Sequence, residues 1–129
     1  MIDHVGVEVT DIAVSRSFYA AALGAIGITP LLEYDEGIGF GSDLGSGPRP
    51  YFWIAERGRR PVSGAHVAFR VPNTEAVDLF HSVAVAAGGT DNGAPGPRPH
   101  YHPGYYGAFV LDPDGNNIEA VCHQYIPEE

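Results

Sequence analysis

Two histidines and one glutamate stand out because their side chains are metal ligands and hold matching positions in predicted strands. His4 and His66 each precede an alternating apolar set, and Glu119 lies in the otherwise apolar segment from Ile118 to Cys122. Alternation with a period of two places these three side chains on the face opposite the apolar residues. Two imidazoles and one carboxylate on a common face would form a facial triad that leaves positions open on a divalent ion.

A second candidate set lies in the segment 97–107, where histidines, tyrosines and an arginine alternate with prolines and glycines. Proline restricts the freedom of such a loop, so we expect its side chains to be held over a pocket. Histidine transfers protons near neutral pH, and a tyrosine hydroxyl donates to a developing oxyanion. The candidates are His102 and Tyr106 for catalysis, with His102 as acid/base, and Arg98, His100 and Tyr105 for substrate contact. The alternative is that the aromatic side chains form a lid or a dimer interface.

The first half of the chain predicts the elements that position His4. A strand over residues 2–10 is followed by a helix over residues 12–23, which Asp11 caps. Three short strands follow, over residues 31–34, 38–42 and 51–56. Tyr51 and Trp53 in the last of them are expected to form a pocket wall that contacts the substrate.

The same order restarts after a glycine-rich linker. His66 opens the second half 62 positions after His4 (66 − 4 = 62), and a helix over residues 75–87 follows. Two similar units, over residues 2–57 and 65–122, indicate an internal duplication. We therefore predict a single α+β domain over residues 1–129 in which two β-α-β-β-β units form one cupped mixed sheet.

If the helices cover the outside of that sheet, then His4, His66 and Glu119 all face its concave inside. The alternative is a pocket in which these residues serve only hydrogen bonding. His123, near the end of the chain, is expected to be solvated.

The turn Asp112-Pro113-Asp114-Gly115 joins the last two predicted strands, over residues 108–111 and 118–122. This turn, Glu119 and the histidine that opens each unit resemble the vicinal oxygen chelate superfamily, which includes glyoxalase I, fosfomycin-resistance proteins, bleomycin-resistance proteins and extradiol dioxygenases. The resemblance covers residues 2 to 122. It implies a divalent metal ion (Fe, Mn, Zn, Ni or Co) on His4, His66 and Glu119, and a homodimer.

The resemblance also implies an enzyme that chelates a small substrate through vicinal oxygens, of the lyase, isomerase or dioxygenase type. Two departures bear on the activity. The strand that supplies a fourth carboxylate in glyoxalase I-like members has only aromatic and aliphatic residues from Tyr51 to Ala55, and Phe109 stands where extradiol enzymes carry a tyrosine. The alternative is a non-enzymatic protein that sequesters a small ligand in the same cup, although bleomycin-binding members lack the metal ligands.

The composition sets limits on partners and location. A chain of 129 residues with 44% hydrophobic and 18% charged residues is typical of one soluble globular domain. The net charge of −9 argues against a nucleic-acid partner. No apolar run approaches the ~18 residues of a membrane span and no leader pattern opens the chain, so we expect a cytoplasmic protein without a membrane partner. The single cysteine, Cys122, permits no internal disulfide.

Overall fold

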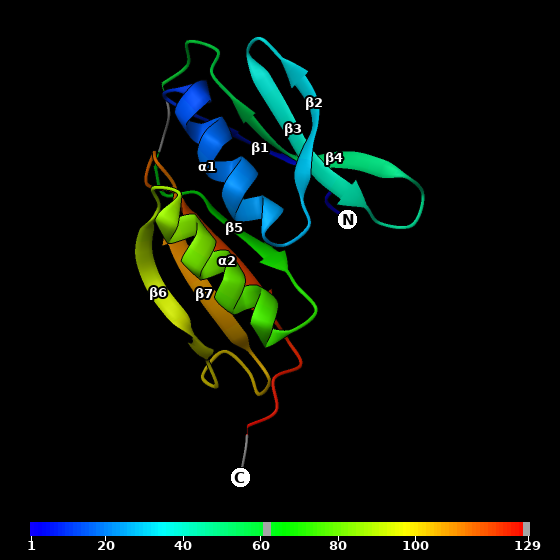
Figure 1. The fold of residues 1–129 in the computed structure, drawn as a ribbon, viewed down its shortest axis with the longest axis vertical. Helices are drawn as coiled ribbons and strands as arrows, with labels where there is room; N and C mark the ends of the chain where they lie inside the picture. Colours follow the sequence, from blue (N-terminus) through cyan, green and yellow to red (C-terminus); the bar gives the residue numbers. More distant parts are fainter. Residues whose placement is uncertain (61–62, 128–129) are drawn as a thin grey trace.

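The computed structural model describes residues 1–60 and 63–127 and contains two copies of one β-α-β-β-β unit. The first unit comprises β1 (Val5–Glu8), α1 (Ile12–Gly24), β2 (Thr29–Tyr34), β3 (Gly37–Asp43) and β4 (Pro48–Ala55). The second comprises β5 (His66–Arg70), α2 (Thr74–Ala86), β6 (Thr90–Pro97), β7 (Tyr106–Leu111) and β8 (Asn117–Cys122). The predicted duplication and the α+β class are confirmed (Figure 1).

The strands form two four-stranded sheets with the same topology. Their orders are β1-β4-β3-β2 and β5-β8-β7-β6, and the first strand of each unit runs parallel to the last. We expected one cupped sheet, but no strand of one unit pairs with a strand of the other within the described residues. In the single chain each unit therefore keeps its own sheet.

Strand β6 was not predicted as a strand, since its sequence is rich in glycine and proline. It lies at the edge of the second sheet, where proline is tolerated because the outer side of the strand needs no ladder hydrogen bond. Its pairing with β7 shifts register around Gly93 and Gly96. These irregularities interrupt the alternation that a sequence pattern detects.

Both helices begin at a side-chain cap, and the sequence predicted that of the first. The Asp11 carboxylate accepts hydrogen bonds from the backbone N–H groups of Ala13 and Val14, at 3.0 and 3.2 Å. The Asn73 side chain accepts one from the N–H of Ala76 at 2.9 Å. Each cap satisfies backbone donors that the first helical turn leaves without partners.

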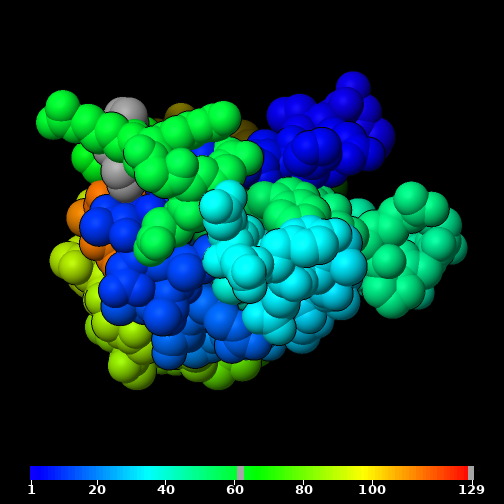
Figure 2. All heavy atoms as spheres, turned by 90° about the horizontal axis from the view of Figure 1, so that it is seen from above, coloured from blue at the N-terminus to red at the C-terminus, as the bar shows by residue number. Residues whose placement is uncertain are grey.

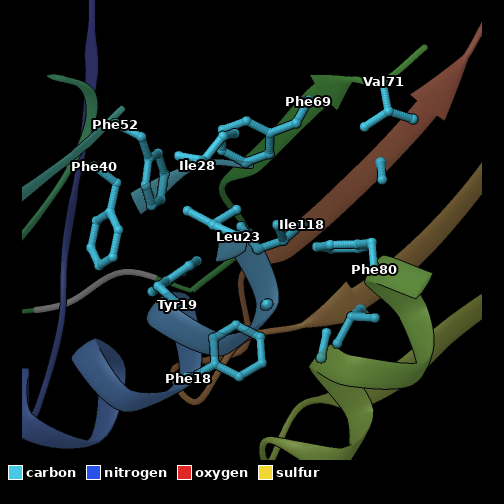
Figure 3. Packing of buried hydrophobic residues seen from close by; sticks show 14 of the residues in the cluster. Phe18, Tyr19, Leu23, Ile28, Phe40, Phe52, Phe69, Val71, Phe80 and Ile118 are labelled. Carbon is cyan, nitrogen blue, oxygen red and sulfur yellow. The ribbon is translucent and has the colours of Figure 1, made fainter. Parts of the chain in front are cut away.

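The two units share one core, in which α1 packs against α2 (Figure 3). Tyr19 of α1 is fully buried and its ring lies 5.0 Å from that of Phe52 in the first sheet. Phe52 in turn meets Phe69 of the second sheet edge to face at 5.4 Å. The faces opposite this core are open to solvent in the single chain: Gly6, His66 and Ala68 are all exposed on them.

The turn between β7 and β8 joins the two units. The buried carboxylate of Asp112 accepts a hydrogen bond from the hydroxyl of Tyr19, and Asp114 accepts one from the backbone N–H of Thr10 at 3.1 Å. The Asp-Pro-Asp-Gly motif therefore fixes the second unit against the first. The two carboxylates of this turn stabilise the contact between the units, whereas the candidate ligand Glu119 lies in the following strand, β8.

Two segments project from the first unit. The N-terminal residues and the turn between β3 and β4 project from the same side of the first unit (Figure 2). No helix in the described residues is long and apolar enough to cross a membrane.

Candidate functional site

Glu119 is the centre of the candidate site. It lies in the middle of β8 with a side chain only 2% exposed, and both carboxylate oxygens have partners. Nε2 of His66 lies 2.8 Å from Oε1, and the hydroxyl of Tyr105 donates to Oε2. The register explains the first contact: Ala68 of β5 pairs with Glu119, so His66, two residues earlier, lies on the same face. His66 itself remains half exposed, so this pair is reachable from solvent.

Tyr105 is held in place by three aromatic rings. The rings of Tyr101, His102 and His123 meet it edge to face at centroid distances of 5.0, 5.3 and 5.4 Å. Burial raises the pKa of the Tyr105 hydroxyl, and the hydrogen bond to Glu119 raises it further. The hydroxyl therefore stays protonated and remains a donor to the carboxylate.

Gly107 makes room for this contact. A Cβ at that position would lie 3.1 Å from Cε1 of Tyr105 and 3.3 Å from Oε2 of Glu119. Any side chain there would press on both groups. Gly107 thus contributes to the site because it has no side chain, which leaves room for Tyr105 and Glu119.

His102 and His123 form a hydrogen-bonded pair beside Tyr105. Nδ1 of His102 lies 2.6 Å from the carbonyl oxygen of Pro103, which only accepts, so this nitrogen carries a proton. In neutral His102, Nε2 is then the acceptor for Nδ1–H of His123, 2.8 Å away. Burial lowers the pKa of His123, with smaller contributions from Arg70 and His102. The expectation that His123 is solvated is wrong, because its ring is only partly exposed and packs against His102 and Tyr105.

The structure corrects the expected position of Tyr106. This residue is the first of β7 and shares its face with Ala108, so its ring lies on the helix side, where the hydroxyl donates to Asp78 at 2.7 Å. Burial and Asp78 raise its pKa to about 12. Tyr105, one residue earlier, points to the face of Glu119 instead.

The other loop residues lie at the edge of this face. The guanidinium of Arg98 donates to the carbonyls of Gly96 and Ala94, at 2.9 and 2.8 Å, and lies over the ring of Phe109. His100 is exposed and contacts only the ring of Tyr101 among the aromatic pairs of the described residues. Arg98 therefore supports the loop that carries Tyr105, and His100 lies farther out.

His4 lies on the open face of the first sheet, away from Glu119. Its Nδ1 is 2.7 Å from a carboxylate oxygen of Asp3, and its side chain is 60% exposed. It lines a cavity of about 500 Å³ together with Trp53. Tyr51 lies two residues before Trp53 in β4, and its hydroxyl is 2.6 Å from that of Ser42. One chain thus brings together two of the three expected metal ligands, and no group of three or more such side chains occurs within residues 1–60 and 63–127.

The internal repeat shows which residue of the first unit corresponds to Glu119. Glu119 pairs with Ala68, and the residue 62 positions before Ala68 is Gly6 (68 − 62 = 6), which pairs with Trp53. Trp53 therefore occupies the place of Glu119 in the first unit. Glu56, which follows β4, accepts a hydrogen bond from the N–H of Ile12 at 2.9 Å.

Glu119 and His66 fit a divalent ion. Carboxylate oxygens and imidazole nitrogens bind such ions at ~2.0–2.2 Å, which requires two adjacent donors to lie about 3 Å apart. The 2.8 Å between Nε2 and Oε1 meets this requirement. Tyr105 on the second oxygen is the type of outer partner that orients a ligating carboxylate.

The sequence profile of the Glyoxalase/Bleomycin resistance protein/Dioxygenase superfamily matches residues 1–120. The chain belongs to this superfamily.

Solved structures of superfamily members share this fold. A glyoxalase/bleomycin resistance protein from Albidiferax ferrireducens T118 is 33% identical, with a TM-score of 0.77 over 93% of this chain and 96% of its own. A glyoxalase/bleomycin resistance protein/dioxygenase family enzyme from Burkholderia phytofirmans PsJN is 23% identical, with a TM-score of 0.71 over 95% and 98%. A lactoylglutathione lyase from Agrobacterium tumefaciens is 17% identical, with a TM-score of 0.67 over 95% and 92%. Among curated proteins no match was found.

Replacing Tyr105 tests directly whether its hydroxyl orients the carboxylate of Glu119. We expect Tyr105→Phe to lower the affinity for Ni²⁺ or Zn²⁺ by ~10–100-fold, because Oε2 of Glu119 loses the donor that orients it. Isothermal titration calorimetry measures the change, with Tyr101→Phe as the matched control, since the Tyr101 ring contacts Tyr105 without bonding to Glu119. Equal affinity in Tyr105→Phe and wild type would show that the hydroxyl does not orient the carboxylate.

Proposed function

We propose that this protein is a metal-dependent enzyme that binds a small substrate through vicinal oxygens. The observation that carries the proposal is the buried carboxylate of Glu119, held at both oxygens beside the half-exposed His66. A buried carboxylate is costly unless it is paired or coordinates a metal. His66 and Tyr105 provide that pairing, and an imidazole beside a carboxylate is a donor set that a divalent ion can bind.

Glu119 and His66 would hold the ion, with His4 as the third ligand from a second copy of the chain. Two observations support the second copy. The faces that carry His4 and Glu119 are both open in the single chain, and His4 and His66 are each more than half exposed there, at 60% and 51%. A homodimer that sets the first sheet of one chain against the second sheet of its partner would unite the three ligands and close the cup.

The chain's own residues favour proton transfer as the chemistry. Glu119 would accept a proton from the substrate through a lone pair that the ion does not use, with Tyr105 holding the carboxylate at Oε2, whereas Nε2 of His66 would be occupied by the ion. A divalent ion, when bound, polarises the substrate oxygens as a Lewis acid. Both ring nitrogens of His102 have partners, Pro103 and His123, so His102 would support Tyr105 and not act as the acid/base that the sequence predicted. This arrangement supports a lyase or isomerase of the glyoxalase type.

A second candidate function is sequestration of a ligand without chemistry. The specific observation in its favour is the cavity beside Trp53, which contains no carboxylate at the position equivalent to Glu119. A protein that binds ligand equally well with and without Glu119, and that binds no metal, would have this function.

Complementation between two variants that each lack one proposed metal ligand tests the proposal. We expect the His4→Ala and Glu119→Ala homodimers each to lose about 100-fold in Zn²⁺ or Ni²⁺ affinity, because each lacks one ligand at both sites. A heterodimer of the two, purified through two different tags, has one site with both substitutions and one with none. Calorimetry should therefore find one site of wild-type affinity per heterodimer.

The controls distinguish an error in the proposed dimer from an error in the assigned metal ligands. Glu75→Ala, at an exposed carboxylate in the first turn of α2, should leave the affinity unchanged. A heterodimer without a restored site would show that His4 and Glu119 do not meet across two chains. Wild-type affinity in both homodimers would contradict the ligand assignment itself.

A further inference from the structure

One end of the second sheet holds a cavity that lies apart from the proposed metal ligands. Its volume is about 410 Å³. It is lined by the last residue of β5 and by residues that follow β5 and β8: Arg70, Val71, Pro72, His123 and Gln124. Arg70 is four residues beyond His66 in β5, which corresponds to about 13 Å along the strand.

The internal repeat shows that two basic residues here replace an ion pair. In the register of the two sheets, Arg70 takes the place of Glu8 in the first unit, and His123 takes that of Arg57. Arg57 donates from Nε to Oε1 of Glu8 at 3.1 Å, so the first unit balances these charges itself. Arg70 is exposed and forms no ion pair within residues 1–60 and 63–127. The second unit therefore has a cation at this place whose counterion can come from a ligand.

A series of hydrogen bonds determines which nitrogen of His123 carries its proton. The carbonyl of Pro103 accepts from Nδ1–H of His102 at 2.6 Å, so neutral His102 accepts at Nε2. His123 donates to it from Nδ1, 2.8 Å away. Neutral His123 consequently has a lone pair and no proton on Nε2, and this nitrogen has no hydrogen-bond partner in the described part of the chain.

The groups around His123 favour its neutral form. Burial lowers the pKa of His123, Arg70 and His102 lower it further, and only Glu119 raises it. Arg70 is always a donor, and the amide of Gln124 adds another, whereas Nε2 of neutral His123 only accepts. The cavity thus combines a positive charge and donors with one acceptor. An oxyanion that carries an O–H group satisfies this combination.

We infer that this cavity binds a small oxyanion that carries its own proton, of which hydrogen phosphate is the simplest. The guanidinium of Arg70 donates to the oxygens of the anion, and Nε2 of His123 accepts from its O–H group. The anion is then to Arg70 what Glu8 is to Arg57 in the first unit. This site goes beyond the proposed function, because neither proposed metal ligand of the second unit lines the cavity.

Phosphate and sulfate test the inference directly, because both are tetrahedral but near neutral pH only phosphate carries a proton. The full chain is freed of metal with a chelator, which is then removed, and each anion is titrated at constant ionic strength while amide NMR signals are followed. We expect phosphate to bind with a Kd of about 1 mM and to shift the signals of Arg70 and His123, and sulfate to bind at least ~10-fold more weakly. Equal binding of the two anions, or binding of neither, would overturn the inference.

Two variants locate the anion and test the role of the histidine pair. Arg70→Gln should weaken phosphate binding at least ~10-fold, because the cationic donor is lost. His102→Phe keeps a ring beside Tyr105 but accepts no hydrogen bond, so either nitrogen of His123 can carry the proton. We expect this variant to bind sulfate about as well as phosphate. A purely structural defect would weaken both anions and leave their ratio unchanged.

The matched control is Arg49→Gln, at an exposed arginine of β4, which should leave both affinities as in wild type. Phosphate binding that survives Arg70→Gln would place the anion elsewhere. An unchanged preference for phosphate in His102→Phe would show that the histidine pair does not select the protonated anion. Either result contradicts the inference.

Free phosphate and the protonated form of a phosphate monoester share this chemistry, and a titration with glycerol phosphate distinguishes them. Tighter binding than that of phosphate would assign the site to an ester, and weaker binding to the free anion. The titrations are made on the oligomer that forms in solution, so a second chain on this face is part of the tested state. Because the protein is free of metal, failure of the proposed metal site leaves the outcome unaffected.

Discussion

Replacing Glu119 by alanine is expected to lower the affinity for Zn²⁺ or Ni²⁺ by about 100-fold or more. The carboxylate is the only anionic donor that the described residues place beside His66. Its removal leaves one imidazole from the second unit, which binds such ions weakly. Calorimetry with each ion, on protein first stripped by a chelator, measures the loss.

The matched variant Glu119→Gln separates charge from shape. The amide fills the same space but is neutral, so we expect it to lose most of the affinity as well. Thermal unfolding of both variants checks that the fold persists. Because Glu119→Ala leaves the Tyr105 hydroxyl without its acceptor, we expect it to unfold at a lower temperature than wild type, and Glu119→Gln, whose amide oxygen still accepts, to unfold closer to wild type. Metal affinity equal to wild type in both variants would contradict the assigned role.

Replacing Asp112 by alanine is expected to cost about 3–5 kcal/mol of unfolding free energy, the largest effect on stability. This carboxylate is 4% exposed. It accepts from the Tyr19 hydroxyl, from the backbone N–H groups of Asp114 and Asn116 at 2.9 and 2.8 Å, and from the Asn116 amide at 3.1 Å. All of these donors lose their acceptor together. Urea unfolding, followed by circular dichroism, measures the change.

A double-mutant cycle assigns part of this cost to the contact between units. Tyr19→Phe removes only the hydroxyl, and we expect a loss of about 1–3 kcal/mol because the bond is buried and one partner is charged. In Asp112→Ala the same change should cost much less, since its partner is already gone. Asp35→Ala, at an exposed carboxylate in the turn between β2 and β3, serves as the control. An Asp112→Ala variant within about 1 kcal/mol of wild type would show that the turn does not join the units.

The sequence predicted the fold and half of the site because both depend on local alternation. The apolar set that begins at Val67 fixes the face of His66, and the apolar set around Glu119 fixes its face, so their meeting follows from strand phase. The parallel pairing of β5 and β8, which brings them within hydrogen-bond distance, follows from the repeated unit.

The remaining features depend on properties that alternation does not report. Tyr105 and Tyr106 are adjacent in a loop without periodicity, and only the start of β7 at Tyr106 decides which of them faces Glu119. His123 enters the site because the chain after β8 brings it against His102, a long-range contact without a local pattern. The position of His4 depends on how two chains associate, which the phase of one strand does not determine.

The most direct test of the metal site is anomalous X-ray diffraction from crystals grown with Ni²⁺, with data collected on both sides of the nickel absorption edge. The proposal predicts one strong peak per chain, about 2.1 Å from Nε2 of His66 and from a carboxylate oxygen of Glu119, with His4 of a second copy as the third ligand. Peaks only at other residues, or an ordered Glu119–His66 pair without a peak at saturating Ni²⁺, would contradict it.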